Sequence, residues 1–436
     1  MSKQMKLMIS AILCMTFMSD LIAQQTLNLE TSVAEALENN YGIKLAELQE
    51  TAVKNEIYKG NAGLTPTIDY NFNFTGNLNQ VNQVFFDDRK INRPAQSFGP
   101  NTNVTLTWTL YDGRRMQSVY QQLKTQGIQS EIQSKVMVQN TTAAVIQAYY
   151  EILKQKRSVS FLNTIIGYYN DRLSLTEQRW QIGRGSKLDY LQSKTDLTAQ
   201  NAELVTAQNA LKNAKVTLNR LLGADPTRAI EVEDVSELKK SYDLEELINQ
   251  AKSQNLELTL NSTEQEINAL LIDQAESFRL PRVGINSAFG YSFNRNTAGL
   301  LLLNQNTGLS AGVSASWNIF NGHQTKRNIE AAKIQLEIKR KEREQLINNI
   351  TSAITSTYYQ YLTDQELYTI EIENKDISEE NLKISLEKFK LGASTILELN
   401  EAQRRFDQSL NRLVNAEYNA RISELELLRL SGQLIK

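Results

Sequence analysis

The sequence predicts a mainly α-helical protein with a small β part, built from two similar halves. A stretch of more than a hundred residues occurs twice, because residues 108–223 match residues 317–432 at a constant offset of 209 without a gap. All five prolines lie outside two long stretches, 101–225 and 282–436, as very long helices require. Short segments of alternating polar and apolar residues also occur at corresponding places in the two halves.

The N-terminal residues 1–23 are predicted to be a signal peptide. Two lysines precede an apolar run from Leu7 to Met18, and Ala23 is a suitable last residue before cleavage. The only cysteine, Cys14, lies inside this run. No later apolar run reaches about 18 residues, so we expect no membrane-spanning helix. The formal net charge of -2 gives no reason to expect nucleic acid as a partner.

The rest of the chain divides into repeat 1 (24–223), a connector (224–242) and repeat 2 (243–436). Each repeat is predicted to begin with helices, at 29–63 and 243–279, in which apolar residues recur at helical spacing. In repeat 1 the second of these helices is expected to run from Ile43 to Gly60. These segments match at an offset of 215, so six residues were lost or gained between Pro66 and Trp108.

Two strands follow in each repeat, at 67–77 and 101–110 and at 282–294 and 308–319. Each is about 10 residues long, which suffices to cross a bilayer at a tilt. Polar loops are expected within each pair, at 78–100 and 295–307. The residues predicted to face lipid are Ile68, Tyr70, Phe72, Phe74, Val104, Leu106, Trp108, Val283, Ile285, Phe289, Tyr291, Phe293, Leu309, Val313 and Trp317.

A single hairpin of this kind would favour a soluble β-sandwich. Here, however, the opposite face is rich in Asn, Asp and Thr, which suits a water-filled lumen better than a protein core. Four strands cannot close a barrel around a channel, and open strand edges are not tolerated in lipid. The strands therefore need other copies of the chain to complete them.

A polar residue and a glycine, Asp112-Gly113 or Asn321-Gly322, connect the second strand of each pair to the next helix. The polar side chain can cap the helix, and the glycine permits a sharp turn. His323, the only histidine, follows the second glycine. Since the mature chain offers no other histidine or cysteine, we expect no metal site and no cofactor there.

Long helices are predicted at 113–180 and 322–388, with apolar positions three and four residues apart. About 65 residues give a helix on the order of 100 Å long, and the average spacing near 3.5 is that of a coiled coil. Short reversals at 181–187 and 389–394 lead into return helices at 188–222 and 395–431. Gly183 and Gly392 suit left-handed C-caps, and Ser186 and Ser394 suit N-caps. A soluble coiled-coil rod remains open at this point.

Several of these segments together resemble the TolC family of outer-membrane efflux proteins. Each motif is weak alone, but their order, spacing and duplication span nearly the whole mature chain. The matching segments are Leu29-Glu30 and Ala36 to Asn40, Leu110 to Arg115, Ile319 to Gly322, Ile182-Gly183, Leu391-Gly392, and Leu221 to Gly223.

The resemblance implies a homotrimer in the outer membrane that extends into the periplasm. Its twelve strands would form a β-barrel in contact with outer-membrane lipid, and its antiparallel helices a hollow α-barrel. Two tips would meet a periplasmic adaptor (membrane fusion) protein that bridges to an inner-membrane pump, in efflux or type I secretion. The tip residues are Gly183, Arg184, Gly185 and Ser186, and Gly392, Ala393, Ser394 and Thr395.

The acidic gate of some family members is not transferred to this chain. A lysine and a leucine stand where the gate carboxylates would align, so Glu379, Glu380 and Glu387 are only nearby candidates. Trp180, beside the first tip, is either a packing residue or an anchor for the adaptor.

Nothing in the sequence suggests an enzyme. It contains no metalloprotease motif and no phosphate-binding glycine loop, and its carboxylates alternate with Lys and Arg on helix faces. The rival interpretation is an exported coiled-coil rod or adhesin without a channel. The alternating strands argue against it, since a rod needs no strands of bilayer length.

Overall fold

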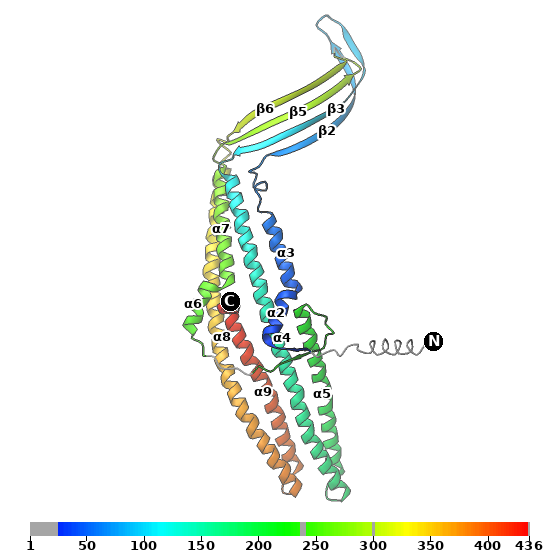
Figure 1. The fold of residues 1–436 in the computed structure, drawn as a ribbon, viewed down its shortest axis with the longest axis vertical. Helices are drawn as coiled ribbons and strands as arrows, with labels where there is room; N and C mark the ends of the chain where they lie inside the picture. The colour runs from blue at the N-terminus through cyan, green and yellow to red at the C-terminus, as the bar shows by residue number, and fades with distance from the viewer. Residues whose placement is uncertain (1–24, 236–240, 299–300, 435–436) are drawn as a thin grey trace, which may run out of the picture. The chain divides into compact units, whose positions relative to one another are not determined.

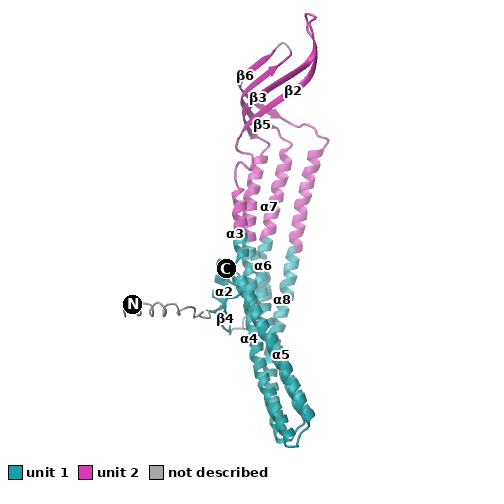
Figure 2. Cartoon of the chain, turned by 90° about the vertical axis from the view of Figure 1, so that its right-hand side faces the viewer, with its two compact units in different colours: residues 1–47, 134–258, 346–436 teal, residues 48–133, 259–345 magenta. Residues whose placement is uncertain are grey.

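The computed structural model describes residues 25–235, 241–298 and 301–434. They form two compact units, which Figure 2 shows in different colours. Unit 1 takes in ranges 1–47, 134–258 and 346–436, and unit 2 takes in 48–133 and 259–345. Most of the described residues are helical, with one four-stranded and one two-stranded sheet (Figure 1). This confirms the predicted fold class of mainly α with a small β part; the predicted signal peptide lies outside the described residues.

Unit 1 is built around two antiparallel helix hairpins. Helices α4 (Arg115–Gln181) and α8 (Gln324–Leu391) begin in unit 2 and end in unit 1. There α4 turns back into α5 (Lys187–Leu222), and α8 into α9 (Ile396–Ser431), so the two hairpins lie together in this unit (Figures 1 and 2). The observed ends differ from the predicted ends of these helices by no more than three residues.

Four shorter helices precede the strands of the two repeats. They are α2 (Leu29–Asn39), α3 (Tyr41–Asn55), α6 (Leu244–Gln254) and α7 (Leu256–Ser277). The prediction that α3 reaches Gly60 was wrong. Its last turn tightens, because the N–H groups of Glu56 and Ile57 bond to carbonyls only three residues back, at 3.0 and 3.1 Å.

Two buried apolar clusters of unit 1 occupy equivalent places in the two repeats. The first includes Ala36, Val145, Tyr149, Ile152 and Leu218. The second includes their counterparts at offsets of 215 and 209: Ala251, Ile354, Tyr361 and Leu427, with Tyr358 partly buried against them. The helical stripe predicted from the sequence therefore becomes the core of both repeats. A third cluster, nearer the tips, joins the two hairpins through residues of α4, α8 and α9.

The predicted connector contains a short strand that the sequence reasoning missed. Strand β4 (Ile230–Val232) pairs in parallel with β1 (Gln25–Leu27). The hydroxyl of Tyr149 lies 3.0 Å from the carbonyl oxygen of Leu27 and 2.8 Å from that of Glu233. The connector is thereby fixed to the long helix α4.

Unit 2 contains the four-stranded antiparallel sheet, in the order β2-β3-β5-β6. Its strands are β2 (Thr67–Val84), β3 (Lys90–Tyr111), β5 (Arg282–Asn296) and β6 (Leu303–Ser316). Each repeat thus contributes one hairpin, and β3 pairs with β5 to join the two hairpins into one sheet.

The prediction of a long polar loop at 78–100 was wrong. Strand β2 continues to Val84 and β3 begins at Lys90, so residues 85–89 form the turn. Asn, Gln and Ser occupy both faces here and hide the alternation, but the pairing uses backbone groups and needs no apolar side chain. The predicted loop at 295–307 is likewise shorter, since β5 extends to Asn296 and β6 starts at Leu303. Strand β6 also ends at Ser316, before the predicted residue 319.

Candidate functional site

Register places the predicted apolar stripes of all four strands on one face of the sheet. Ile68 lies opposite Leu106, Val104 opposite Phe289, and Phe289 opposite Leu309. The other members of this apolar face are Tyr70, Phe72, Phe74, Trp108, Val283, Ile285, Tyr291, Phe293 and Val313. Ile68 is 68% exposed and Val313 73% exposed. A continuous exposed apolar face of this kind marks a surface that meets lipid or another protein.

The opposite face of the sheet, which we call the polar face, carries small polar side chains in cross-strand rows. In one row Asn71 lies opposite Asn103, and the side-chain amide of Asn71 donates to Asn103 Oδ1 over 3.1 Å. Asn103 in turn lies opposite Gly290, and Gly290 opposite Gly308. One face therefore suits an apolar environment and the other suits water.

Two tryptophans attach the base of the sheet to the segments that precede each hairpin. The indole N–H of Trp108 donates to the carbonyl of Leu64 over 3.3 Å, and that of Trp317 donates to the carbonyl of Arg279 over 3.0 Å. Trp317 stands one residue beyond the end of β6, so its ring is positioned by this bond and not by strand pairing. The equivalent bonds fix the start and the end of each hairpin relative to each other.

The predicted turns from strand to helix cap the long helices as expected from the sequence. Both carboxylate oxygens of Asp112 lie 3.1 Å from the N–H of Met116. Asn321 Oδ1 accepts from the N–H of Thr325 over 3.4 Å. Gly113 has a φ of 75°, and an added Cβ would lie 2.5 Å from the carbonyl oxygen of Ser277, so only glycine fits.

A strained residue follows each of these glycines, which the sequence reasoning missed. Arg114 and His323 have positive φ angles of 72° and 68° at equivalent positions of the two repeats. His323 packs edge-on against Phe320 with ring centroids 5.4 Å apart.

The two predicted tips have the same backbone turn and both belong to unit 1. Gly183 and Gly392 have φ angles of 72° and 77°. Behind them, the N–H of Arg184 donates to the carbonyl of Arg179 over 2.8 Å, and the N–H of Ala393 to that of Lys388 over 2.8 Å. This pattern closes a helix through a left-handed residue.

The return helices begin at hydroxyl caps. Ser186 Oγ accepts from the N–H of Leu188 over 3.1 Å. In the second tip the cap is Thr395, whose hydroxyl accepts from the N–H of Glu398 over 3.3 Å. The prediction of Ser394 as the cap was wrong by one residue, because helix α9 starts at Ile396; the Ser394 hydroxyl is buried without a hydrogen-bond partner.

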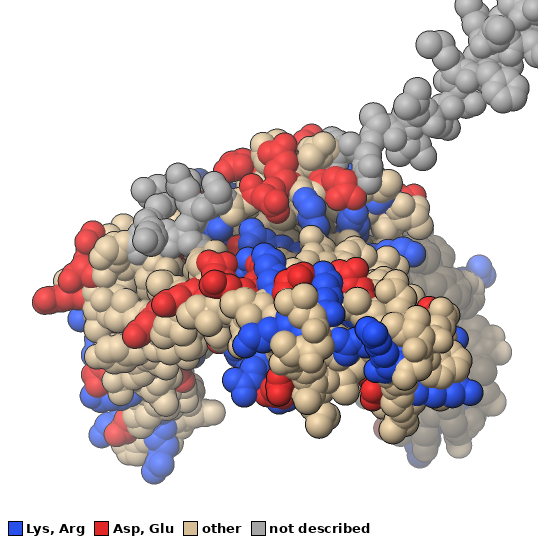
Figure 3. Space-filling view, turned by 90° about the horizontal axis from the view of Figure 1, so that it is seen from below, with Lys and Arg blue, Asp and Glu red and all other residues tan. Residues whose placement is uncertain are grey.

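Both tips expose large aliphatic side chains. Ile182 and Leu188 are exposed in the first tip, and their equivalents Leu391 and Leu397 in the second, with Leu391 83% exposed. Seen from this end, both Lys and Arg and Asp and Glu side chains lie among uncharged side chains (Figure 3). Trp180 stacks on Tyr190 with ring centroids 5.2 Å apart and Lys187 over its ring, yet Trp180 is still 36% exposed. Trp180 therefore packs against residues of its own chain, and part of its ring remains accessible to solvent.

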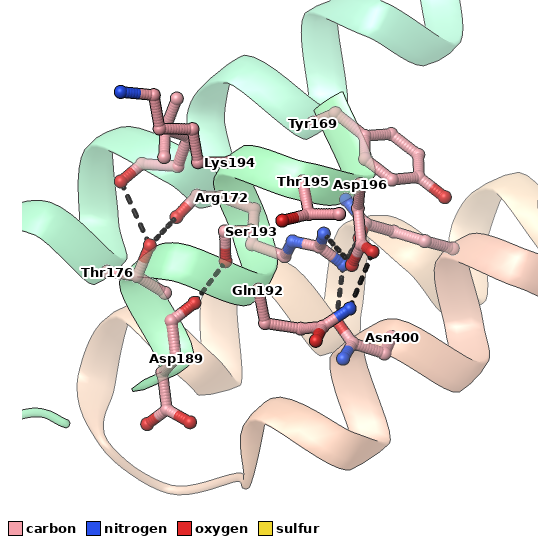
Figure 4. Close-up of polar contacts among 12 residues, drawn as sticks. Tyr169, Arg172, Thr176, Asp189, Gln192, Ser193, Lys194, Thr195, Asp196 and Asn400 are labelled. Atoms are coloured by element: carbon pink, nitrogen blue, oxygen red, sulfur yellow. Dashed lines mark hydrogen bonds and ion pairs between the residues drawn. The ribbon is translucent and has the colours of Figure 1, made fainter. Parts of the chain in front are cut away.

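A buried arginine links the two hairpins just behind the tips (Figure 4). Arg172 of α4 is 1% exposed and pairs with Asp196 Oδ2 of α5 at 2.5 Å. It also donates to Gln403 Oε1 of α9 at 2.7 Å and to Asn400 Oδ1. Its guanidinium lies 4.8 Å from the ring centre of Tyr169. One cation thus holds three helices together.

A second polar contact between the hairpins lies beside this arginine. The hydroxyl of Tyr169 donates to Asp407 Oδ2 over 2.9 Å. Burial raises the pKa of Asp407 to about 6, and the nearby Glu203 carboxylate adds to the rise, while the hydrogen bond from Tyr169 and the charge of Arg172 oppose it. Burial also raises the pKa of the Tyr169 hydroxyl, so the tyrosine remains a donor at neutral pH.

The spacing of residues in α4 indicates this buried polar cluster. Leu162, Ile165, Tyr169, Arg172 and Thr176 follow one another three or four residues apart, and all five are buried. An arginine and a threonine therefore occupy positions of the apolar stripe, where a buried charge requires partners.

The nearby carboxylates named from the sequence lie on α8 before the second tip. Glu379 pairs with Lys375 at 2.7 Å and Lys383 at 2.8 Å, and these two hydrogen-bonded lysines lower its pKa. Glu387 pairs with Lys390 at 2.7 Å, and Glu380 is exposed.

The described ranges contain neither a candidate metal site nor a candidate membrane helix. Within 25–235, 241–298 and 301–434, no group of three or more His, Cys, Asp and Glu side chains could hold a metal ion. None of the helices in these ranges is long and apolar enough to cross a membrane.

Comparisons with known proteins agree with this architecture. The family model described as "Outer membrane efflux protein" matches residues 33–224 and 247–433. The outer membrane protein TolC of Vibrio cholerae is 21% identical over 416 residues, covering 93% of this chain and 91% of that protein. TolC of Escherichia coli is 24% identical over 367 residues, covering 77% and 71%. The alkaline protease secretion protein AprF of Pseudomonas aeruginosa is 21% identical over 396 residues, covering 88% and 80%.

A solved structure has the same fold. The outer-membrane channel OprN superposes with a TM-score of 0.77 at 17% identity, covering 93% of this chain and 90% of OprN. In this chain a strand hairpin lies between helices in each of the two repeats, and a tip lies at the end of each long helix; OprN shares this fold. The chain belongs to the outer membrane efflux protein family, to which both repeats match. It is therefore an outer-membrane channel protein, and the family resemblance noted from the sequence is confirmed.

Proposed function

We propose that three copies of this chain form one channel, with twelve strands in the outer membrane and a hollow α-barrel in the periplasm. The observation that carries the proposal is the sheet of unit 2. Its apolar face is exposed, and its outer strands β2 and β6 each have one neighbouring strand among the described residues. In lipid, each unpaired backbone group costs several kcal/mol. Strands from neighbouring copies would supply the missing partners.

Exposed apolar side chains on the helices support the same assembly. In unit 2, Ile334 and Ile338 of α8 line a shallow groove beside Lys333 and Lys341. In unit 1, α8 also exposes Ile370 and Ile377. Isolated apolar residues are normal on a surface, but repeated ones along one long helix favour contact with a neighbouring helix.

The two tips are proposed as the docking surface for a periplasmic adaptor. The docking residues are those predicted from the sequence, Gly183, Arg184, Gly185 and Ser186 with Gly392, Ala393, Ser394 and Thr395. The exposed aliphatic side chains on either side of these turns provide apolar contact area. The accessible part of Trp180 could add to it, as an aromatic residue beside the first tip.

The proposed cargo route begins at an inner-membrane pump and ends outside the cell. The family description supports efflux, and AprF, a relative of this chain, is named for protease secretion. Both routes use an open passage and need no catalytic group in the chain itself.

Assembly is tested by expressing the full chain and fractionating the membranes. The expected result is a band in the outer-membrane fraction that migrates as a trimer without heating and as a monomer after boiling. A monomer in the soluble periplasmic fraction would contradict the proposal.

The rival, an exported rod without a channel, is tested by conductance. Purified trimer added to a planar lipid bilayer should produce discrete conductance steps. A rod would be recovered as an elongated particle without conductance.

A further inference from the structure

The polar face of the sheet is nearly free of charge. Apart from Asp69, the four rows that begin at Thr67, Asp69, Asn71 and Asn73 consist of Asn, Ser, Thr, Gly and Ala, and Arg93 of β3 lies on the same face much further along, opposite Val81. From the base outward, three successive rows are Thr67, Thr107, Asn286 and Gly312; Asp69, Thr105, Ala288 and Ser310; and Asn71, Asn103, Gly290 and Gly308. A fourth row contains Asn73, Asn101, Ser292 and Asn306.

Asp69 is the one charged residue in these four rows. Its side chain is exposed, and it lies opposite Thr105. The Thr105 hydroxyl is directed to Asn103 Oδ1 at 3.3 Å. Within the described part of the chain no ion pair involves Asp69. Its negative charge is therefore available to a solute that passes along this face.

The nearest cation on the polar face of β5 is too far away to neutralise Asp69. Arg282 lies at the start of β5 and donates to Thr109 Oγ1 over 3.0 Å. Ala288 is the residue of β5 that lies in the same row as Asp69. Arg282 precedes Ala288 by six residues, which at 3.3 Å per residue places it roughly 20 Å from this row. The Debye length is about 10 Å at 0.1 M salt, so the two charges act at separate levels of the wall.

We infer that Asp69 sets the charge preference of the barrel wall, which favours cations over anions and offers neutral polar solutes only hydrogen bonds. This inference rests on the proposed trimeric channel, in which the polar face lines the lumen and three Asp69 carboxylates lie at one level. A ring of carboxylates raises the local concentration of cations and repels anions. The other three of these rows, made of Asn, Ser, Thr and Gly, contribute dipoles but no net charge.

The test is the reversal potential of the purified trimer in a planar bilayer under a gradient of KCl at low salt. For the wild type we expect a potential of the sign that marks K⁺ preference. Asp69→Asn should move it toward zero, and Asp69→Lys should move it further, to the sign of Cl⁻ preference. Asp69→Glu keeps the charge and should leave it unchanged.

A second variant adds charge to the same row. Ala288→Asp places a carboxylate two strands away from Asp69, and it should increase the K⁺ preference. Because loss and gain of a carboxylate act in opposite directions, a general disturbance of folding cannot imitate the pair. The control is Asp87→Asn, in the β2–β3 turn, where Asp87 is paired with Arg89 at 2.6 Å; it should have no effect.

The outcomes separate this inference from the proposed function. Conducting channels whose reversal potential is the same in the wild type, Asp69→Asn and Ala288→Asp would overturn the inference and leave the channel proposal standing. Absence of conductance in a correctly assembled wild-type trimer would overturn the channel proposal and the inference with it.

Discussion

Asn40 donates its side-chain amide to the backbone carbonyl of Leu221 over 2.6 Å, and Asn255, its equivalent, does the same to Leu430 over 3.1 Å. Asn40 Oδ1 also accepts from the N–H groups of Gly42 and Ile43 at 2.8 and 3.2 Å. One side chain therefore separates two successive helices and closes the end of a return helix. From the sequence, Asn40 was noted only as the end of one of the segments that resemble the TolC family.

Replacing this asparagine should destabilise unit 1. Asn40→Ala leaves a partly buried carbonyl and two helix N–H groups without their partner, and such a loss costs about 1–3 kcal/mol. We expect a lower temperature for the loss of helical circular dichroism, and a similar loss for Asn255→Ala.

The matched control for this prediction is Asn411→Ala. Asn411 is exposed on α9, and its side-chain amide donates to the carbonyl of Asp407 in its own helix. Its replacement should change stability by no more than about 0.5 kcal/mol. Equal effects at Asn40 and Asn411 would show that the contact to Leu221 contributes nothing.

Proline at the first tip should separate docking from assembly. Gly183 has a φ of 72°, which proline cannot adopt, and its N–H donates to the carbonyl of Trp180 over 3.0 Å. Gly183→Pro should therefore distort the tip in unit 1 while the strands of unit 2 still assemble. We expect a normal heat-sensitive trimer and strongly reduced export in a cell-based efflux or secretion assay.

Gly167→Ala serves as the control for the tip variant. Gly167 lies inside α4, and an added Cβ would meet nothing within 4 Å. Trimer and export should both remain normal. If Gly183→Pro reduced the trimer as much as it reduced export, the tip would be required for assembly and not for docking alone.

Removal of the buried arginine should loosen the two hairpins from each other. Arg172→Met keeps the length of the side chain but leaves Asp196 and Gln403 without their cation. Breaking a fully buried pair costs about 3–5 kcal/mol, and the loss here should be smaller because the Asp196 side chain is 28% exposed. Amide hydrogen exchange in residues near the tips should become faster. Arg404→Met removes an exposed arginine, paired with Glu401, and should leave the exchange unchanged.

The raised pKa of Asp407 predicts a pH dependence with a definite sign. The pKa rises from 3.8 in an unfolded chain to about 6 in the folded chain, so the folded state binds more protons in this window. The contribution of this carboxyl to stability is complete below pH 3.8 and is lost as pH rises through 6. With allowance for solvent screening, the loss is roughly 1–3 kcal/mol.

The measurement compares Asp407→Asn with the wild type from about pH 3 to about pH 7, a range that spans both pKa values. The variant lacks this titration, so its stability relative to the wild type should increase up to about pH 6 and then stay constant. Asp376→Asn, an exposed aspartate paired with Lys375, is the control. A constant difference across the range would contradict the assignment to Asp407.

Length and periodicity predicted most of this fold. Helix ends near Gly183 and Gly392 were located because a left-handed residue has a strong glycine preference. Strand ends were not located, because outside the apolar stripes Asn and Gln give no period that separates a strand from a loop. The extension of β2 to Val84 depends on backbone pairing with β3, which no local pattern reveals.

The surface residues of the candidate site were predicted from the sequence, but its buried polar residues were not. Exposed tips and the apolar strand face follow from local composition. The Arg172 cluster depends on partners from two other helices. Asp196 of α5 is 24 residues away from Arg172 in the sequence, and Gln403 of α9 is 231 residues away. A polar residue in an apolar stripe indicates that partners exist, but their identity depends on how the helices pack.

The bonds of Trp108 and Trp317 limit how the hairpins could change during evolution. Leu64 and Arg279, which accept these bonds, correspond at an offset of 215, and the two tryptophans correspond at an offset of 209. Both ends of the hairpin were therefore kept, while six residues between them were gained or lost. Six is an even number, and side chains alternate between faces with a period of two. Insertions and deletions in pairs leave every side chain on its original face, whereas an odd change would need a bulge or a different turn. We therefore expect hairpin lengths among related chains to differ mainly by even numbers of residues.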